Sequence, residues 1–175
     1  MADAQTVTSR PTESPALEWL ALSLTPGLGP KRGRSLVEHL GGVENVFNAS
    51  LTELEAAGIR AVSAQSLATG RSTELAQDEL GRATAAGVSV VCLDDSSYPA
   101  QLKQIYDPPL VLYVRGNVEA IGLPGIAVVG TRHPTPYGLG MAERLSCDLA
   151  ARGLVIFSGL ARGVDAAAHR GAITA

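Results

Sequence analysis

A glycine-rich stretch in the second half of the chain has the residue types of an anion-binding site. An apolar run at 126–129 ends in a polar loop, and a helix is predicted to begin near residue 137. Glycine lets an oxyanion approach backbone N–H groups, a helix N-terminus favours negative charge, and threonine and arginine donate hydrogen bonds to phosphate. The candidate residues of this first loop are Gly130, Thr131, Arg132, Thr135, Tyr137 and Gly138. Because the spacing is not Gly-x-Gly-x-x-Gly, no dinucleotide cofactor is indicated, and an ordinary strand-to-helix turn is the alternative.

A second loop of small residues follows the apolar run at 154–157 and leads into another predicted helix. Its candidate anion-binding residues are Ser158, Gly159, Arg162 and Gly163. In an open parallel sheet, ligands bind at the carboxyl ends of adjacent strands, so we expect the two loops to lie side by side. Asp165 stands at the start of the helix, where we expect it to cap the helix and brace the loop. His169 lies four residues later and can pair with Asp165 across one helical face.

Catalysis and metal binding are weaker interpretations of the same residues. A nucleophilic set of Ser158, His169 and Asp165 lacks the Gly-x-Ser-x-Gly turn that exposes such a serine. The histidines His39, His133 and His169 are scattered without metal-ligand spacing. We therefore predict no catalytic residue, no metal site and no cofactor.

A smaller basic cluster in the first half of the chain is formed by Lys31, Arg32 and Arg34, just after a turn at 25–30. Two helices joined by a Gly-x-Gly turn resemble a helix-hairpin-helix, which points backbone N–H groups at a nucleic-acid phosphate without reading sequence. The alternative is a structural helical hairpin whose basic residues are solvated. The sequence leaves both interpretations open.

The hydrophobic pattern predicts the elements that position these residues. Helical spacing indicates helices at 15–24, 31–40, 61–67, 73–86 and 139–151, with Ser14 capping the first, and a Ser50–Glu53 capping box opens a further helix that ends near 58. Apolar runs of strand length lie at 88–93, 110–114, 126–129 and 154–157. Strands that alternate with helices are typical of an α/β fold with a parallel sheet covered on both faces.

These elements predict a flexible tail at 1–14, an all-helical module at 15–70 and a Rossmann-like α/β domain at 71–175. Four strands are found, whereas open doubly wound sheets usually have five or six. We therefore expect the α/β domain to be incomplete at its C-terminus and the sequence to be part of a longer chain.

Composition limits the classes of protein that fit. The chain has 175 residues, of which 46% are hydrophobic and 18% charged, so it is not a disordered or low-complexity protein. A net charge of -3 means that a nucleic-acid site must be a local patch. Cys92 and Cys147 are expected to be free thiols in a reducing cytoplasm, because no signal peptide or membrane-spanning run is found in the sequence.

With these motifs in view, the sequence resembles the DprA/Smf family of DNA-processing proteins. The residues that carry the resemblance are Ser-Gly-Leu-Ala-Arg-Gly-Val-Asp-Ala-Ala-Ala-His at 158–169, Val-Val-Gly-Thr-Arg at 128–132, Thr-Pro-Tyr-Gly at 135–138, Tyr-Pro-Ala-Gln-Leu at 98–102, and Asp-Pro-Pro-Leu-Val-Leu-Tyr-Val-Arg-Gly at 107–116. Several linked motifs in matching order make the resemblance specific.

The resemblance implies a sterile-alpha-motif-like helical domain followed by an extended Rossmann fold that binds single-stranded DNA. Family members protect single strands during natural transformation and help load the RecA recombinase, and no catalysed reaction is attributed to them. The DNA-contacting arginine of the family falls at Arg132, and the neighbouring loop corresponds to Ser158, Gly159 and Arg162. The family also implies a homodimer, formed largely through a part of the Rossmann domain that lies beyond this sequence.

Two other classes of function remain as alternatives. One is an enzyme of the related nucleotide-processing Rossmann group, such as a phosphoribohydrolase, although its Pro-Gly-Gly-x-Gly-Thr loop is absent. The other is a scaffold whose loops bind nothing.

Overall fold

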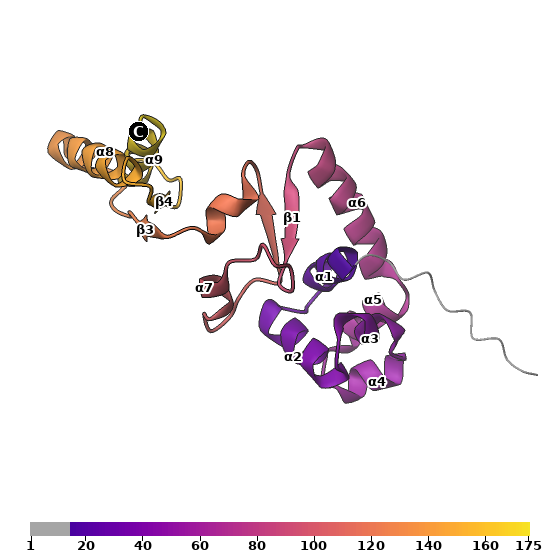
Figure 1. Cartoon of the computed structure of the whole chain (residues 1–175). Coiled ribbons are helices and arrows are strands. Elements are labelled where there is room, and N and C mark those ends of the chain that lie inside the picture. Colours follow the sequence, from indigo (N-terminus) through magenta and orange to yellow (C-terminus); the bar gives the residue numbers. More distant parts are fainter. Residues whose placement is uncertain (1–14) are drawn as a thin grey trace, which may run out of the picture. The chain divides into compact units, whose positions relative to one another are not determined.

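The computed structural model describes residues 15–175, whose contacts divide into two compact units (Figure 1). Unit 1 is Met1–Gly116 and unit 2 is Asn117–Ala175. The flexible tail expected at 1–14, and Ser14 as a helix cap, lie outside the described residues. Within the described part of the chain, no helix is long and apolar enough to cross a membrane.

Unit 1 begins with a series of helices that the hydrophobic pattern predicted, apart from one. The helices are α1 (Pro15–Leu24), α2 (Pro30–Leu40), α3 (Val43–Asn48), α4 (Leu51–Ala56), α5 (Ala61–Ala68) and α6 (Arg71–Ala85). The sequence analysis missed α3, because six residues are too few to show a helical period. The capping box of α4 is confirmed, since the Glu53 backbone N–H donates to Ser50 Oγ and the Glu53 carboxylate accepts from the Ser50 backbone N–H at 2.8 Å. The Ser50 hydroxyl also donates to Glu53 Oε2 at 2.7 Å, and this bond together with that from the Ser50 backbone N–H holds the pKa of Glu53 below its ordinary value.

The core of unit 1 forms around α1. Leu17, Leu20 and Ala21 are buried together with Ala76 of α6, which places α6 in the same core as the first helix. Trp19 is also buried, and its indole N–H donates to Asp94 Oδ2 at 3.2 Å. Unit 1 therefore extends past the module boundary that the sequence indicated at residue 70, because α6 and the segment that follows it pack onto α1.

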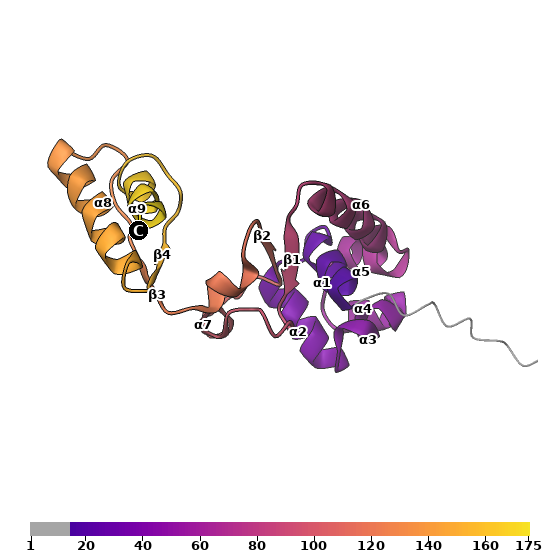
Figure 2. The same cartoon turned by 45° about the horizontal axis from the view of Figure 1, so that its top comes forward.

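The four predicted strands do not join into one parallel sheet. β1 (Ser89–Cys92) pairs antiparallel with β2 (Val111–Val114) in a two-stranded sheet of unit 1, and Figure 2 shows the two strands side by side. The prediction of a parallel arrangement is wrong for these strands. The loop between them contains the short helix α7 (Ala100–Lys103). The two ends of this loop are joined where Leu93 N–H donates to the Leu110 carbonyl at 2.9 Å. A loop closed there reverses the chain, whereas parallel neighbours need a crossover that carries the chain back to the same end.

Unit 2 contains the parallel strands. After the 3-10 helix η1 (Val118–Gly122), strand β3 (Gly125–Ala127) leads through α8 (Pro136–Ala150) to β4 (Val155–Phe157), and the last helix is α9 (Val164–Ile173). The strands β3 and β4 pair in parallel, residue 125 opposite residue 155. This strand–helix–strand crossover is the repeating unit of a Rossmann-like sheet, and it confirms the α/β class for this part of the chain.

The helices of unit 2 pack closely against each other. Gly171 of α9 lies against the backbone of α8 at Glu143 and Cys147, where a side chain on residue 171 would overlap the Glu143 carbonyl. The contact is extended by an ion pair between Arg170 Nε and Glu143 Oε2 at 3.6 Å. This packing holds together the two helices whose N-termini follow the candidate loops.

Candidate functional site

The two candidate loops leave adjacent parallel strands and are joined directly beyond them. Val128 N–H donates to the Phe157 carbonyl at 2.9 Å, which continues the pairing of β3 with β4 by one residue. The Ser158 hydroxyl donates to the Val128 carbonyl at 2.7 Å, so it links the start of the second loop to the first strand. The structure thus brings the two loops together at the carboxyl edge of the sheet, where sequence reasoning expected them.

Asp165 holds the two loops in position. Its side chain is 6% exposed in the first turn of α9, and Oδ1 accepts from Gly130 N–H at 3.3 Å while Oδ2 accepts from Gly159 N–H at 3.1 Å. The expected pairing with His169 is not formed, because both carboxylate oxygens turn to the loop amides. His169 Nε2 is buried and has no hydrogen-bond partner among residues 15–175.

The glycines of the loops make this close approach possible. Gly163 has φ 89°, and a Cβ there would overlap the backbone of the first loop at Thr131 and Arg132. A Cβ on Gly130 would lie 2.8 Å from the Val164 side chain, and one on Gly159 would lie 2.9 Å from the Asp165 carboxylate. A side chain at residue 130 or 163 would push the loops apart, and one at residue 159 would displace the Asp165 carboxylate.

The threonines of the first loop organise its backbone. Thr135 is the N-cap of α8, and its Oγ1 accepts from Gly138 N–H at 3.1 Å. Thr131 Oγ1 accepts from His133 N–H at the same distance of 3.1 Å. Since each hydroxyl acts here as an acceptor, its own O–H remains a donor that can be directed at a ligand.

The positive charge of the site is not neutralised by the protein. Arg132 and Arg162 are exposed, one in each loop, and neither guanidinium forms an ion pair or hydrogen bond within the described part of the chain. Tyr137 follows the first loop at the start of α8 and is 77% exposed. Two unpaired guanidinium groups beside two helix N-termini form an arrangement suited to a phosphate-bearing ligand.

The arrangement does not assemble a catalytic relay. Ser158 donates its proton to a backbone carbonyl, Asp165 accepts from two backbone amides, and no hydrogen bond links Ser158, Asp165 and His169 to one another in the described residues. Nor does any group of three or more His, Cys, Asp or Glu side chains in residues 15–175 have the geometry to hold a metal ion.

Two exposed apolar side chains at the loops were missed by sequence reasoning. Leu160 has φ 55°, a left-handed conformation that costs a leucine ~1–2 kcal/mol, and its side chain is 76% exposed. Val129 ends the first apolar run and is 73% exposed. Both residues read as ordinary loop or strand residues in the sequence, because only the folded backbone shows the strain and the exposure.

The basic cluster of unit 1 is largely engaged by other side chains. Lys31 Nζ donates to the Tyr106 hydroxyl and lies 4.6 Å from the centre of the Tyr106 ring. Arg34 Nε forms an ion pair with Glu38 Oε1 at 3.4 Å. The remaining cation, Arg32, has no side-chain partner in the described residues. The cluster therefore offers less free positive charge than its sequence indicates.

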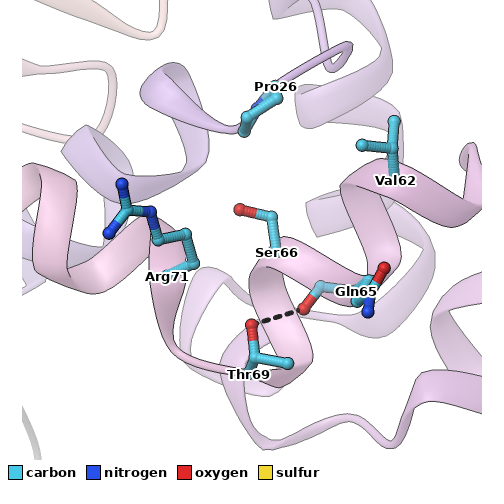
Figure 3. A pocket seen from close by; sticks show the side chains of 6 residues that line it. All are labelled: Pro26, Val62, Gln65, Ser66, Thr69 and Arg71. Carbon is cyan, nitrogen blue, oxygen red and sulfur yellow. Dashed lines mark hydrogen bonds between the residues drawn. The ribbon is translucent and has the colours of Figure 1, made fainter.

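Unit 1 also has an open hollow of about 260 Å³ where α5 meets α6 and the turn after α1 (Figure 3). It is lined by Pro26, Val62, Gln65, Ser66, Thr69 and Arg71. Two of its polar side chains have partners within unit 1: Ser66 Oγ bonds to Ser72 Oγ at 2.9 Å, and Arg71 Nη1 bonds to Glu74 Oε2 at 3.3 Å.

The fold and the paired loops together define a class of protein: a helical module followed by a Rossmann-like α/β unit. Residues 89–175 match the family model described as DNA recombination-mediator protein A. Protein Smf from Synechocystis sp. is 34% identical over 158 residues, which cover 86% of this chain and 39% of that protein. DNA processing protein DprA from Bacillus subtilis is 39% identical over 90 residues, which cover 51% of this chain and 30% of that protein.

A solved structure supports the same relationship. The X-ray structure of DNA processing protein A (DprA) from Streptococcus pneumoniae superposes with a TM-score of 0.70 and 28% identity, over 91% of this chain and 54% of that chain. The chain belongs to the DprA/Smf family, a family of DNA processing and recombination. The aligned part of the chain covers 39% of the length of the Synechocystis protein and 30% of that of the Bacillus subtilis protein.

Proposed function

We propose that this chain binds single-stranded DNA at the paired loops of unit 2, without catalysing a reaction. The observation that carries the proposal is the pair of exposed guanidinium groups of Arg132 and Arg162, which have no partner in residues 15–175 and lie in loops joined through one carboxylate. A phosphodiester backbone supplies the anion that such groups bind without reading sequence.

The chemistry of the loops favours binding over nucleotide cleavage. The Ser158 hydroxyl donates to the Val128 carbonyl and the Asp165 carboxylate accepts from two loop amides, so neither group is free to act as a nucleophile or a base. A phosphoribohydrolase would release a free base from a nucleoside monophosphate. We expect no base release when the chain is incubated with nucleoside monophosphates, and release would favour the enzymatic alternative.

The names of the relatives support a proposal about the biological process. The relatives from Bacillus subtilis and Streptococcus pneumoniae are DNA processing proteins, and the family model describes a recombination mediator. We propose that the whole protein protects incoming single strands during natural transformation in the cytoplasm. In the same proposal it helps to load the RecA recombinase and works as a homodimer.

The experiment that tests the site is Arg132→Ala in this chain, with binding to fluorescent single-stranded oligonucleotides measured across a range of salt concentrations. Loss of one charged contact should weaken binding about five- to tenfold for all sequences alike. The slope of log K against log salt should flatten by about 0.7, the share of one single-strand phosphate. The matched control is Arg144→Ala, because Arg144 is an exposed arginine of α8 in the same unit.

Circular dichroism of the Arg132 variant should match the parent chain, since an exposed loop arginine contributes little to folding. If the folded variant binds with unchanged affinity and salt slope, or if the control loses as much, the loops are not the DNA site.

A further inference from the structure

The apolar tips of the two loops are the feature that phosphate binding leaves unexplained. This inference rests on the proposed function: we propose that Leu160, together with Val129 of the first loop, contacts unstacked nucleobases and so makes the site select single strands over duplexes. Leu160 is then a base-contacting, specificity-determining residue in a site whose cations contact only phosphate.

The backbone around Leu160 is held so that its side chain remains outside. On one side, Gly159 N–H donates to Asp165 Oδ2 at 3.1 Å; on the other, the Ala161 carbonyl accepts from Ala166 N–H at 3.1 Å. Both neighbours of Leu160 are thus tied to the first turn of α9. Glycine or asparagine would adopt this left-handed conformation with less strain. The Leu160 side chain is mostly exposed, so packing inside unit 2 does not offset the strain.

Val129 is the exposed apolar residue of the first loop. It directly precedes Gly130, whose N–H donates to the same carboxylate that accepts from Gly159. The two exposed apolar side chains therefore each stand one residue from an amide bound by Asp165, at the ends of adjacent parallel strands. Arg132 follows Val129 by three residues in the sequence, so apolar surface and positive charge belong to the same short loops.

A single strand is the nucleic acid that fits both kinds of surface. Its bases are unstacked and present apolar faces, while its phosphates meet the arginines; in a duplex the base faces are stacked on one another and closed to such contact. Contact with base faces is tolerant of sequence because every base has such a face. The proposed occupant of the apolar surface is therefore an unstacked base and not a polypeptide segment.

The test uses oligonucleotides of about 12 nucleotides. One is all thymine, and the other has the same phosphates but abasic residues at its centre. The parent chain should bind the abasic strand about fivefold more weakly, since part of one leucine side chain loses its apolar contact. Leu160→Asn should lose most of this preference and bind the all-thymine strand nearly as weakly as the parent chain binds the abasic strand. Asparagine tolerates the left-handed backbone but removes the larger of the two apolar groups.

The control variant is Ile173→Ala, because Ile173 is 84% exposed at the opposite end of α9, and it should keep the full preference for bases. A parent chain that binds both strands equally, or a Leu160→Asn variant that retains the preference, overturns the inference while leaving the Arg132 result intact. If a polypeptide segment covers the loops instead, Leu160→Asn leaves the preference for bases unchanged, and this result also refutes base contact by Leu160. Absence of salt-dependent binding to either strand would instead refute the proposed function itself.

Discussion

Asp165→Asn tests whether one carboxylate holds both loops of the site. In the folded chain its two oxygens accept from Gly130 N–H and Gly159 N–H, which belong to different loops. Asparagine has nearly the same shape but only one acceptor oxygen, and its NH₂ group would face the second amide. The substitution therefore keeps the packing of the buried side chain and removes one arm of the brace.

The magnitude follows from the two hydrogen bonds. A hydrogen bond to a charged group contributes ~1.5–3 kcal/mol, and distances of 3.1 and 3.3 Å argue for the lower part of that range. Losing one bond and weakening the other should cost about 2 kcal/mol in the free energy of unfolding of unit 2. In domains of roughly 60–100 residues, each kcal/mol lowers the melting temperature by about 4–8 °C, so the expected loss is roughly 10 °C.

Two measurements on the variant distinguish a brace from general damage to the fold. Thermal unfolding by circular dichroism gives the stability, and amide hydrogen exchange by NMR reports on Gly130 and Gly159 individually. Both amides should lose protection together, and affinity for single strands should fall although Arg132 is unchanged. The control is Asp148→Asn, at an exposed aspartate of α8, which should leave the melting temperature and both amides unaffected.

The bracing role of Asp165 is refuted if both glycine amides keep the protection seen in the parent chain. A melting temperature within about 1 °C of the parent would contradict the assigned energies, since that is the shift expected from only a few tenths of a kcal/mol.

Three further substitutions test the buried thiol of Cys92 and two glycines of unit 2. Burial, with Asp95 and Asp94 nearby, raises the pKa of Cys92 from 9.0 to about 12, so the unfolded chain loses the thiol proton at lower pH than the folded chain. The Cys92 contribution to stability should therefore be intact below pH 9 and fall between pH 9 and about 12. Urea titrations should show this pH dependence in the parent chain and not in Cys92→Ala. Gly163→Ala should lower the free energy of unfolding by about 3 kcal/mol, because residue 163 has φ 89° and a Cβ there overlaps the first loop. Gly140→Ala, in open space within α8, should raise it by ~0.5–1 kcal/mol. Thermal melts that show equal effects for the two variants would contradict both assignments.

Several features of this protein follow from the sequence because the information lies within a few neighbouring residues. The apolar stripe of α1, the Ser50–Glu53 capping box and the apolar runs of the four strands each reflect local spacing, and the structure contains all of them. The paired glycine-rich loops were also predictable, since a strand–loop–helix order repeated across one crossover has few arrangements.

Other features depend on which distant groups the fold brings together. The antiparallel pairing of β1 with β2 depends on how the connecting loop closes, and strand-length apolar runs do not encode that direction. Asp165 could bond to His169 on its own helix, but the folded loops present two backbone amides that satisfy both of its oxygens. Lys31 is likewise engaged by Tyr106, far along the chain, and the strain at Leu160 exists only in the closed loop. Local patterns thus determine the elements, whereas the partners of polar side chains are decided by tertiary contacts, because a buried donor or acceptor must find whichever group the fold places within reach.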